Sequence, residues 1–294
     1  MPERPSAANQ TSVALANLDG RILPLAEAKV SALDRGFLFG DAVYEVLRVY
    51  AGRPWLADEH FARLARSLAA IRIAGVDLTR LRQRMTATIA AGNYREATVY
   101  IQVTRGSAPR RHAFPTDAVP FELLFVQEFI DPYVKAREAG ASVVLQPDIR
   151  WGRCDIKSTN LLANVLALQA AKEADCVEAL LYLPDGTLTE GTHSSLLGLH
   201  RGQVITAAHG PSILPGVTRD WIVALARKHE IPVSERNLCR DELAAVDELF
   251  LSGTTTEVLP IVRVGGQLVA NGSPGPVTRR LRLLYQDAVR NFCA

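Results

Sequence analysis

The chain has 294 residues, of which 48% are hydrophobic and 22% are charged, a composition typical of a soluble globular protein long enough for two domains. Its 33 lysines and arginines are interspersed with 31 aspartates and glutamates, and the formal net charge of +2 gives no electrostatic basis for binding nucleic acid or a membrane surface. No apolar run approaches the roughly 20 residues needed to cross a bilayer, so we expect neither a membrane nor nucleic acid among the partners.

The first part of the chain predicts a small domain of helices and strands. Residues 1–12 are polar and contain prolines, so we expect a disordered tail there. Apolar residues at helical spacing predict two helices, the first capped by Asp58 and the second starting at Thr79. Strands are predicted at 13–18 and 21–25, joined as a hairpin at Asp19-Gly20, and then at 43–50, 98–104 and 121–128.

A long loop joins the last two of these strands. It contains Arg105, Arg110, Arg111 and His112, which are too few charges for a phosphate-backbone footprint but suit a smaller anion. A loop of this length is uncommon unless it has a function. We therefore predict that it binds a small anionic group.

The pattern restarts at Asp131-Pro132, where we place the domain junction. A short helix ending at Gly140 leads into a second half in which short strands alternate with helices and with tight turns at Asp185-Gly186 and Gly265-Gly266. Few parallel strand–helix–strand units are expected, which favours an α+β fold over a doubly wound sheet. The predicted strands are 141–145, 178–183, 194–199, 203–206, 248–252 and 258–264, and the predicted helices are 161–174, 218–230 and 277–289.

The cysteines and histidines indicate neither a disulfide framework nor a metal centre. The four cysteines are scattered and form no CxxC pair, which fits free thiols in a reducing compartment. The histidines have no metal-ligand spacing, so no metal is expected. We expect a cytoplasmic protein.

One lysine lies in an unusual sequence context. Lys157 is one of only five lysines, and it occupies a short polar turn between the Trp151 segment and a run of leucines. We therefore expect its amine to be partly desolvated, which favours the neutral nucleophile needed for Schiff-base chemistry. A lysine taken alone is more often an ordinary surface residue, so the interpretation depends on the other motifs.

Four further segments each have a functional and an ordinary interpretation. Glu190 ends a predicted strand, and Arg63 lies in the first turns of a predicted helix; either could simply be solvated. The segments 215–218 and 252–256 offer backbone N–H groups and hydroxyls that could hold a phosphate or simply cap a helix and a turn. Together with Lys157 they match what pyridoxal 5′-phosphate requires: an amine for its aldehyde, an acid for its ring nitrogen, and an arginine with N–H-rich loops for its phosphate.

These motifs and several others occur in the order and spacing of a known family. The chain resembles the fold-type IV pyridoxal-phosphate aminotransferases from about Leu18 to near its C-terminus, and within them it is most similar to the D-amino-acid aminotransferases. The resemblance rests on Asp34-Arg35-Gly36-Phe37-Leu38-Phe39-Gly40-Asp41, Tyr44-Glu45-Val46, Arg105-Gly106, Pro109-Arg110-Arg111-His112, Asp148-Ile149-Arg150-Trp151 and the segments around Lys157 and Glu190.

The resemblance implies a role for each residue of the cofactor site. Lys157 would form the Schiff base and move the proton between the substrate Cα and C4′ of the cofactor, and Glu190 would pair with the pyridine nitrogen. The phosphate would be held by Arg63, Val217, Thr218 and Thr254. The implied fold is a small N-terminal α/β domain at 13–130 and a larger, barrel-like, cofactor-binding domain at 131–294.

The resemblance also implies the reaction and the assembly. Tyr44, with Arg110 and His112 from a neighbouring subunit, would bind the substrate α-carboxylate, so the enzyme would be a homodimer. A bidentate arginine beside a histidine and a tyrosine is a reasonable clamp for a carboxylate. The expected reaction is a ping-pong transamination between a D-amino acid such as D-alanine and a 2-oxo acid such as 2-oxoglutarate or pyruvate.

Two residues depart from the family pattern, and other functions stay open. His193 and Gly253 stand where the resemblance leads us to expect small hydroxyl residues, and neither change is expected to prevent the chemistry. The same scaffold serves L-branched-chain and amine transaminases and aminodeoxychorismate lyases, which release pyruvate by β-elimination. An alternative from another class is a catalytically silent protein that only binds pyridoxal phosphate.

Overall fold

The computed structural model describes residues 13–294, so the expected disordered tail at 1–12 lies outside the described residues. The chain divides into two compact units. The first consists of the chain up to Pro54 together with Ile73–Ile130, and the second consists of Trp55–Arg72 together with Asp131–Ala294. The division after Ile130 falls at the predicted junction, whereas Trp55–Arg72, expected in the N-terminal domain, groups with the second unit.

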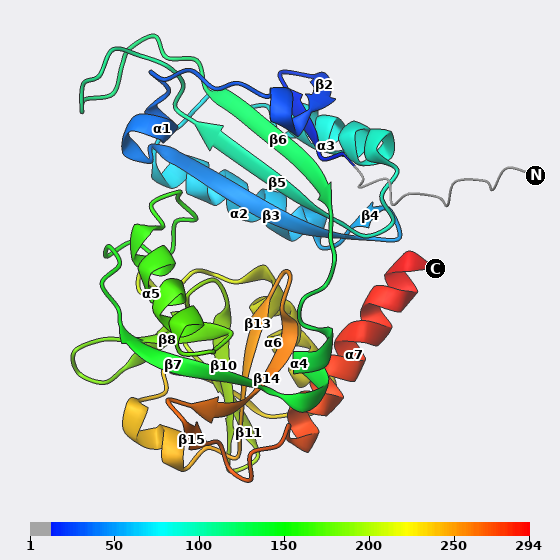
Figure 1. Cartoon of the computed structure of the whole chain (residues 1–294), viewed down its shortest axis with the longest axis vertical. Helices are drawn as coiled ribbons and strands as arrows, with labels where there is room; N and C mark the ends of the chain where they lie inside the picture. Colours follow the sequence, from blue (N-terminus) through cyan, green and yellow to red (C-terminus); the bar gives the residue numbers. More distant parts are fainter. Residues whose placement is uncertain (1–12) are drawn as a thin grey trace, which may run out of the picture. The chain divides into compact units, whose positions relative to one another are not determined.

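The first unit is built on one antiparallel sheet with the strand order β2-β1-β6-β5-β3-β4. Its long helix α3 (Leu78–Gly92) packs against β1 and β6 and buries Leu81, Met85 and Ile89, the face that the sequence predicted (Figure 1). The strands are β1 (Leu15–Leu18), β2 (Arg21–Pro24), β3 (Ala42–Tyr50), β4 (Arg53–Pro54), β5 (Ala97–Thr104) and β6 (Phe121–Glu128), with a 3-10 turn η1 (Leu25–Glu27).

A short helix of the first unit, α1 (Arg35–Phe39), was not predicted from the sequence. Asp34 caps its start by accepting hydrogen bonds from the N–H groups of Gly36 and Phe37, and Gly40, at φ 64, ends it in the left-handed conformation. Capping by aspartate and termination by glycine are strong local signals. At five residues the helix is too short to show an apolar period, which is the signal that a sequence reading uses.

The second unit contains a nine-stranded mixed sheet with the order β12-β11-β10-β13-β14-β7-β8-β9, and β15 pairs with β14. β7 pairs in parallel with β14 and β8, and β11 with β12, while the other pairs are antiparallel; this mixture agrees with the predicted α+β class. The strands are β7 (Ala141–Pro147), β8 (Glu178–Tyr182), β9 (Leu188–Gly191), β10 (Ser195–His200), β11 (Gln203–Thr206), β12 (Val233–Glu235), β13 (Glu248–Gly253), β14 (Glu257–Val264) and β15 (Gln267–Leu268).

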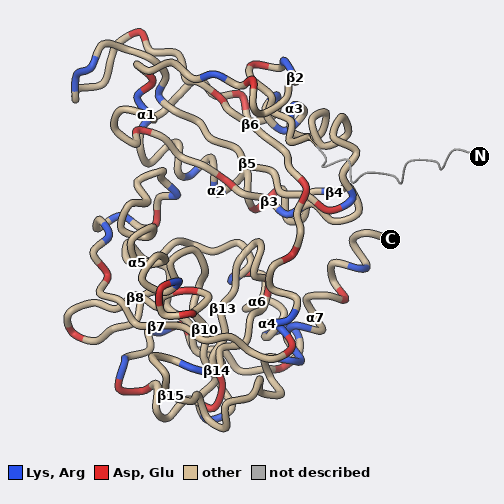
Figure 2. The backbone as a smooth tube through the Cα atoms, in the orientation of Figure 1, with Lys and Arg blue, Asp and Glu red and all other residues tan. Residues whose placement is uncertain are grey.

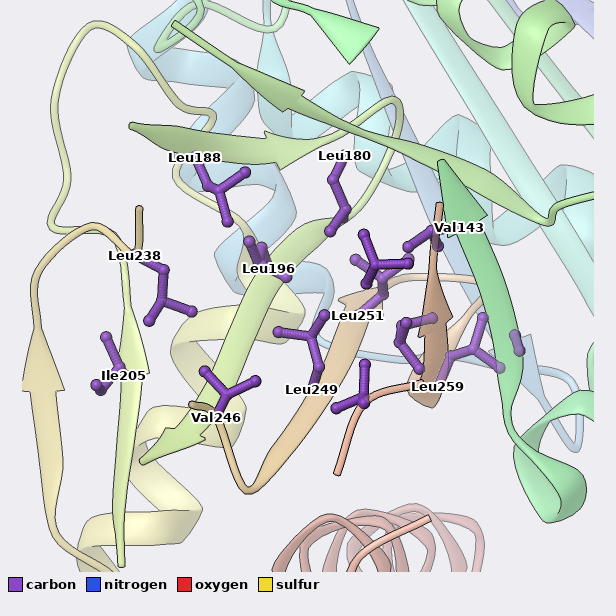
Figure 3. Packing of buried hydrophobic residues seen from close by; sticks show 14 residues of the cluster. Val143, Leu180, Leu188, Leu196, Ile205, Leu238, Val246, Leu249, Leu251 and Leu259 are labelled. Atoms are coloured by element: carbon purple, nitrogen blue, oxygen red, sulfur yellow. The ribbon is translucent and has the colours of Figure 1, made fainter. Parts of the chain in front are cut away.

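Helices pack on this sheet, which encloses a large apolar core. In Figure 3 the side chains of Val143, Leu180, Leu196, Leu251 and Leu259 point toward one another from different strands, and all are buried. α5 packs on β7 and β8, while α4 and α7 pack on β14 (Figure 1). The helices are α2 (Ala57–Ala70), α4 (Val134–Ala139), α5 (Leu162–Glu173), α6 (Val217–Lys228) and α7 (Pro276–Cys293), with a 3-10 turn η2 (Arg240–Ala244).

The predicted cap of α2 was wrong. The helix starts after Leu56, at φ 51, and its N-cap makes no side-chain hydrogen bond, whereas Asp58 lies in the first turn. There the carboxylate still faces the positive end of the helix dipole, which explains why it resembles a cap. The inward face is as predicted, because Phe61, Leu64 and Leu68 are buried.

Charged residues of both signs are interspersed along the backbone of each unit (Figure 2). This distribution agrees with the balanced composition of the sequence. Among residues 13–294, no helix is long and apolar enough to span a membrane.

Candidate active site

Lys157 lies in the turn between β7 and α5, and the rest of the turn holds it in place. Its backbone N–H donates to the Ser67 hydroxyl of α2 at 3.2 Å, and the next residue, Ser158, is buried and donates its N–H to the Ile156 carbonyl at 2.8 Å. Lys157 itself is partly buried. The residue is thus half-buried, and the desolvation expected for its amine stays a prediction.

Glu190 lies on β9 and is buried. Its carboxylate forms an ion pair with Arg150 and accepts the Leu214 N–H at 3.1 Å on each oxygen. Burial raises the pKa of Glu190 to about 7, although Arg150, the Leu214 N–H and the positive charge of Lys157 all favour the ionised form. A carboxyl group that titrates near neutral pH is typical of a functional site. The positive charge of Lys157 therefore acts on the Glu190 carboxylate.

Arg150 contacts Glu190, and the motif Asp148-Ile149-Arg150-Trp151 that contains it predicted no role for it. Its guanidinium holds Asp148 with two hydrogen bonds, Nε to Oδ1 at 2.9 Å and Nη2 to Oδ2 at 2.7 Å, while Nη1 pairs with Glu190. The Thr189 hydroxyl also donates to Asp148, at 2.8 Å. Burial alone would raise the pKa of Asp148, but the bonds from Arg150 and Thr189 lower it below its ordinary value. Arg150 is thus shared by two buried carboxylates.

Arg63 projects from α2 and is buried. One of its guanidinium nitrogens donates to the Pro215 carbonyl at 3.0 Å, next to the start of α6 at Val217 and Thr218. The first N–H groups of a helix have no partners within the helix and attract anions. The arginine and this helix start, both predicted for the phosphate, therefore lie next to each other.

The second predicted phosphate loop, which contains Thr254, follows β13. It lies near the first one, because Ser252 pairs in register with Ser195 of β10, and a Cβ added at Gly216 would lie 2.6 Å from the Ser195 hydroxyl. The buried hydroxyls of Ser252 and Thr256 have no hydrogen-bond partner within the described residues. The two predicted phosphate-binding segments therefore lie close together.

The two departures from the family pattern have structural explanations. A Cβ at Gly253 would lie 2.6 Å from the Thr256 hydroxyl, so a serine there would compete with Thr256 for space. His193 follows β9 and lies 3.3 Å from both the Tyr133 hydroxyl and the buried Glu178 carboxylate. Glu178 also accepts the His193 N–H at 2.7 Å, so the imidazole belongs to a connected polar group.

The three predicted substrate-binding residues belong to the first unit. Arg110 and His112 lie on the loop between β5 and β6, and the Phe39 ring is 5.3 Å from the Arg110 guanidinium and 5.4 Å from the His112 ring. Tyr44 lies on β3 and stacks against Tyr100, with ring centroids 5.6 Å apart. The structure thus brings Arg110 and His112 together on Phe39 and places Tyr44 on the neighbouring sheet.

Comparisons with known proteins agree with this arrangement. The family model for class IV aminotransferases matches residues 42–264. The D-alanine aminotransferase of Bacillus licheniformis is 37% identical over 275 residues, which cover 92% of this chain and 95% of that protein. The D-alanine aminotransferase of Staphylococcus aureus strain COL is 38% identical over 279 residues, covering 93% and 97%.

Solved structures show the same fold. The branched-chain amino acid aminotransferase of Escherichia coli superposes with a TM-score of 0.86 at 25% identity, covering 95% of this chain and 94% of that one. The T.th. branched-chain amino acid aminotransferase, solved with pyridoxamine 5′-phosphate, gives a TM-score of 0.86 at 25% identity, with 95% of both chains covered. The chain therefore belongs to the class IV aminotransferase family and is an aminotransferase.

Proposed function

We propose that this aminotransferase transfers the amino group of a D-amino acid such as D-alanine to a 2-oxo acid such as 2-oxoglutarate or pyruvate, with pyridoxal 5′-phosphate as its cofactor. The observation that carries the proposal is the group formed by Lys157, Glu190 and Arg63 in the second unit. The preference for D-amino acids is supported by the D-alanine aminotransferases that are 36–38% identical over most of the chain, and by the Arg110 and His112 loop.

The residues of the second unit fit pyridoxal phosphate. The buried hydroxyls of Ser252 and Thr256, which have no partner within the described part of the chain, flank the loop of Thr254. Arg63 lies beside the start of α6, and these groups together would neutralise and bind a phosphate. The residues that would hold the phosphate are Arg63, Val217, Thr218 and Thr254. When bound, the cofactor supplies an aldehyde for the Lys157 amine and a ring that withdraws electrons from the substrate Cα.

Glu190 would hold a proton at the ring nitrogen. For this it must be ionised, and the Arg150 guanidinium, the Leu214 N–H and Lys157 all favour that form. A cationic ring nitrogen would add a further positive charge beside the carboxylate and lower the Glu190 pKa from about 7. Arg150 and Asp148 hold the carboxylate in a fixed orientation.

Lys157 would move the substrate proton. Its amine would be the base that takes the proton from the substrate Cα, and the same amine would return that proton at a different carbon. The backbone of the turn that carries Lys157 is fixed by Ser67 and by the Ile156 carbonyl. Which Cα hydrogen faces Lys157 is then decided by how the α-carboxylate is held.

Arg110, His112 and Tyr44 would hold that carboxylate. Arg110 offers two parallel N–H donors, and His112 and Tyr44 would add single hydrogen bonds. We propose that Arg110 and His112 act on the site of a neighbouring subunit, in a homodimer. The exposed apolar side chains of α5 and of the preceding segment support such a contact between copies; they are Ile149, Trp151, Leu162, Val165 and Leu166. The four cysteines form no disulfides, which supports placing the enzyme in the cytoplasm.

The test is the visible absorption spectrum of the purified protein loaded with pyridoxal phosphate, recorded before and after adding D-alanine or L-alanine without any 2-oxo acid. Loss of the band of the lysine-bound cofactor with D-alanine alone supports the proposal. Loss with L-alanine or L-leucine alone would keep the cofactor and reject the assigned D-preference. A protein that stays colourless after incubation with pyridoxal phosphate would reject the whole proposal.

A further inference from the structure

The loop that carries Arg110 and His112 begins at Arg105. This arginine shares the carboxylate of Asp41 with Arg35 of α1. Arg35 donates from Nε to Asp41 Oδ2 at 2.8 Å, and Arg105 binds both oxygens of the same carboxylate at 2.8 and 2.9 Å. Both arginines are buried and the Asp41 side chain is only 12% exposed. Burial would raise the pKa of Asp41, but the hydrogen bonds from Arg105 and Arg35 lower it below its ordinary value. Asp41 is therefore a fixed anion between two cations.

Arg35 uses its remaining donors on the backbone of this loop. Nη1 donates to the carbonyls of Arg111 at 2.6 Å and Ala113 at 3.4 Å, and Nη2 donates to the His112 carbonyl at 3.2 Å. Three consecutive carbonyls, in the middle of a loop without regular structure, thus converge on one guanidinium. A planar guanidinium with five N–H donors can bind a carboxylate and three carbonyls at once, whereas an ammonium has only three donors.

The start of the loop is also fixed by short contacts with the segment before α1. Asp34 accepts the Thr104 hydroxyl at 2.7 Å, and Arg35 N–H donates to the Gly106 carbonyl at 2.9 Å. Gly106 has φ +92, and a Cβ there would lie 1.9 Å from the Val119 carbonyl oxygen, so the loop is closed at a position that admits only glycine. In Figure 1 the loop between β5 and β6 runs beside α1.

Phe39, at the other end of α1, supports the side chains that the loop presents. Its ring lies 4.9 Å from the Arg35 guanidinium, 5.3 Å from that of Arg110 and 5.4 Å from the His112 ring. A cation over an aromatic face is attracted by the ring and held in orientation. Arg35 and Phe39 thus hold the backbone and the side chains of the same loop.

We propose that Arg35 is a positioning residue for substrate binding: by gripping the carbonyls of residues 111–113 while it is fixed by Asp41, it presets the Arg110 and His112 side chains to receive the substrate carboxylate. This inference rests on the proposed function, in which these two side chains bind that carboxylate. A loop that is ordered before binding does not lose its freedom on binding, so presetting strengthens affinity without a new contact. The same fixed orientation would support discrimination between D- and L-amino acids.

The test compares Arg35→Lys with the control Arg111→Met, in the pyridoxal-phosphate-loaded enzyme. Lysine keeps the charge beside Asp41 but cannot bind three carbonyls, whereas Arg111 is an exposed neighbour on the same loop. The D-alanine concentration that half-saturates the spectral half-reaction should rise about tenfold or more in Arg35→Lys, with the limiting rate changed less than about threefold. Arg111→Met should change neither by more than about twofold.

Limited proteolysis gives a readout that does not depend on activity. Trypsin should cleave after Arg110 about tenfold faster in Arg35→Lys than in the wild type, because cleavage requires the loop to open locally. Cleavage at other sites and the melting temperature should change little, which separates a local role from general destabilisation. Phe39→Leu, at a half-buried position where the fold is preserved, should weaken D-alanine binding about threefold.

The outcomes separate this inference from the proposed function. If the wild type does not respond to D-alanine, the proposed function fails, and the proteolysis of Arg35→Lys still decides whether Arg35 orders the loop. If the wild type responds and Arg35→Lys matches it in both half-saturation and cleavage, the positioning role is overturned. An equal loss of limiting rate and affinity, with faster cleavage throughout the chain, would also overturn it, since Arg35 would then be a general stability residue.

Discussion

Each of the two units contains a cluster of arginine and carboxylate side chains, but the numbers of arginines and carboxylates are reversed between them. In the second unit one arginine, Arg150, is shared by Asp148 and Glu190, so one positive and two negative charges leave −1 when Glu190 is ionised. In the first unit one carboxylate, Asp41, is shared by Arg35 and Arg105, so two positive charges and one negative leave +1. The side chains of both groups are at most 12% exposed, and so their surplus charge is only weakly screened.

The difference matches the charge that each unit is proposed to meet. A surplus negative charge at Glu190 suits a protonated ring nitrogen, whereas a surplus positive charge behind the Arg110 loop suits a carboxylate. The Arg150 group of the second unit also lies at the end of a sheet, while the Asp41 group of the first unit supports a loop. Chemistry common to the family would then depend on a rigid strand, and substrate choice on a loop held from behind.

The largest effect is expected from replacing Lys157, which should abolish the reaction without altering the loop of Arg110 and His112. Lys157→Ala should lower transamination by at least about 10³-fold, because in the proposed site Lys157 alone would supply the amine that reacts with the cofactor and moves the Cα proton. Stopped assays with D-alanine and 2-oxoglutarate measure this, and circular dichroism should show an unchanged fold. Lys172→Ala, an exposed lysine on α5, is the matched control. A Lys157→Ala variant that retains most of the activity would reject the assigned role.

The second prediction concerns the energetic consequence of burying Glu190. Without cofactor its pKa of about 7 lies above the ordinary value of 4.5, so between these pH values the folded chain binds a proton that the unfolded chain has lost. Its contribution to the free energy of unfolding should therefore fall as pH rises from about 4.5 to 7, by up to about 3 kcal/mol. The difference between wild type and Glu190→Gln in urea unfolding of the cofactor-free protein isolates this slope, because the other groups cancel. Parallel pH profiles for the two proteins would contradict it.

The sequence indicated the proposed site residues of both regions more clearly than the residues that support them. Lys157 is recognisable because a lysine in a short polar turn is locally unusual, whereas Glu190 taken alone could be a solvated residue and gained its role only beside the other motifs. Arg150 and Arg35 occur within longer motifs, but the sequence alone predicted no role for either of them. Their partners, Glu190 and the carbonyls of residues 111–113, are 40 and about 76 residues away, and only the folded chain brings them together.

Helices and strands, too, were predicted where their signal is local and were missed where it depends on distant segments. Strands and helices with a clear apolar period, such as β6 and α3, were predicted to within one or two residues. The five-residue α1 and the short strands β12 and β15 were missed, because they are stabilised by capping and pairing with distant segments rather than by periodicity. The grouping of α2 with the second unit also arises from long-range packing.

The third prediction tests the binding region directly. Arg110→Ala should raise the KM for D-alanine about 10- to 30-fold while the limiting rate falls much less, because the lost interaction is made equally in the bound substrate and the transition state. Initial rates over a range of D-alanine concentrations measure both constants. Arg111→Ala is the control, since its backbone is held by Arg35 while its side chain is exposed. An unchanged KM in Arg110→Ala would count against the clamp.

The smallest effect is expected at His193, which departs from the family pattern beside the acid region. Replacing it in His193→Ser removes the ring between Tyr133 and Glu178, but Glu178 keeps the backbone N–H of residue 193 and the Ser194 hydroxyl, at 3.0 and 2.9 Å from its two oxygens. The buried carboxylate therefore stays hydrogen-bonded, and kcat/KM for D-alanine should change by no more than about threefold, with stability lowered by about 1 kcal/mol or less. Steady-state kinetics and thermal unfolding measure the two quantities, with Ser194→Ala as the variant that removes the other side-chain partner. A loss of more than about 30-fold in His193→Ser would show that the imidazole takes part in the reaction. The proposed catalytic group would then include His193 besides Glu190 and Arg150.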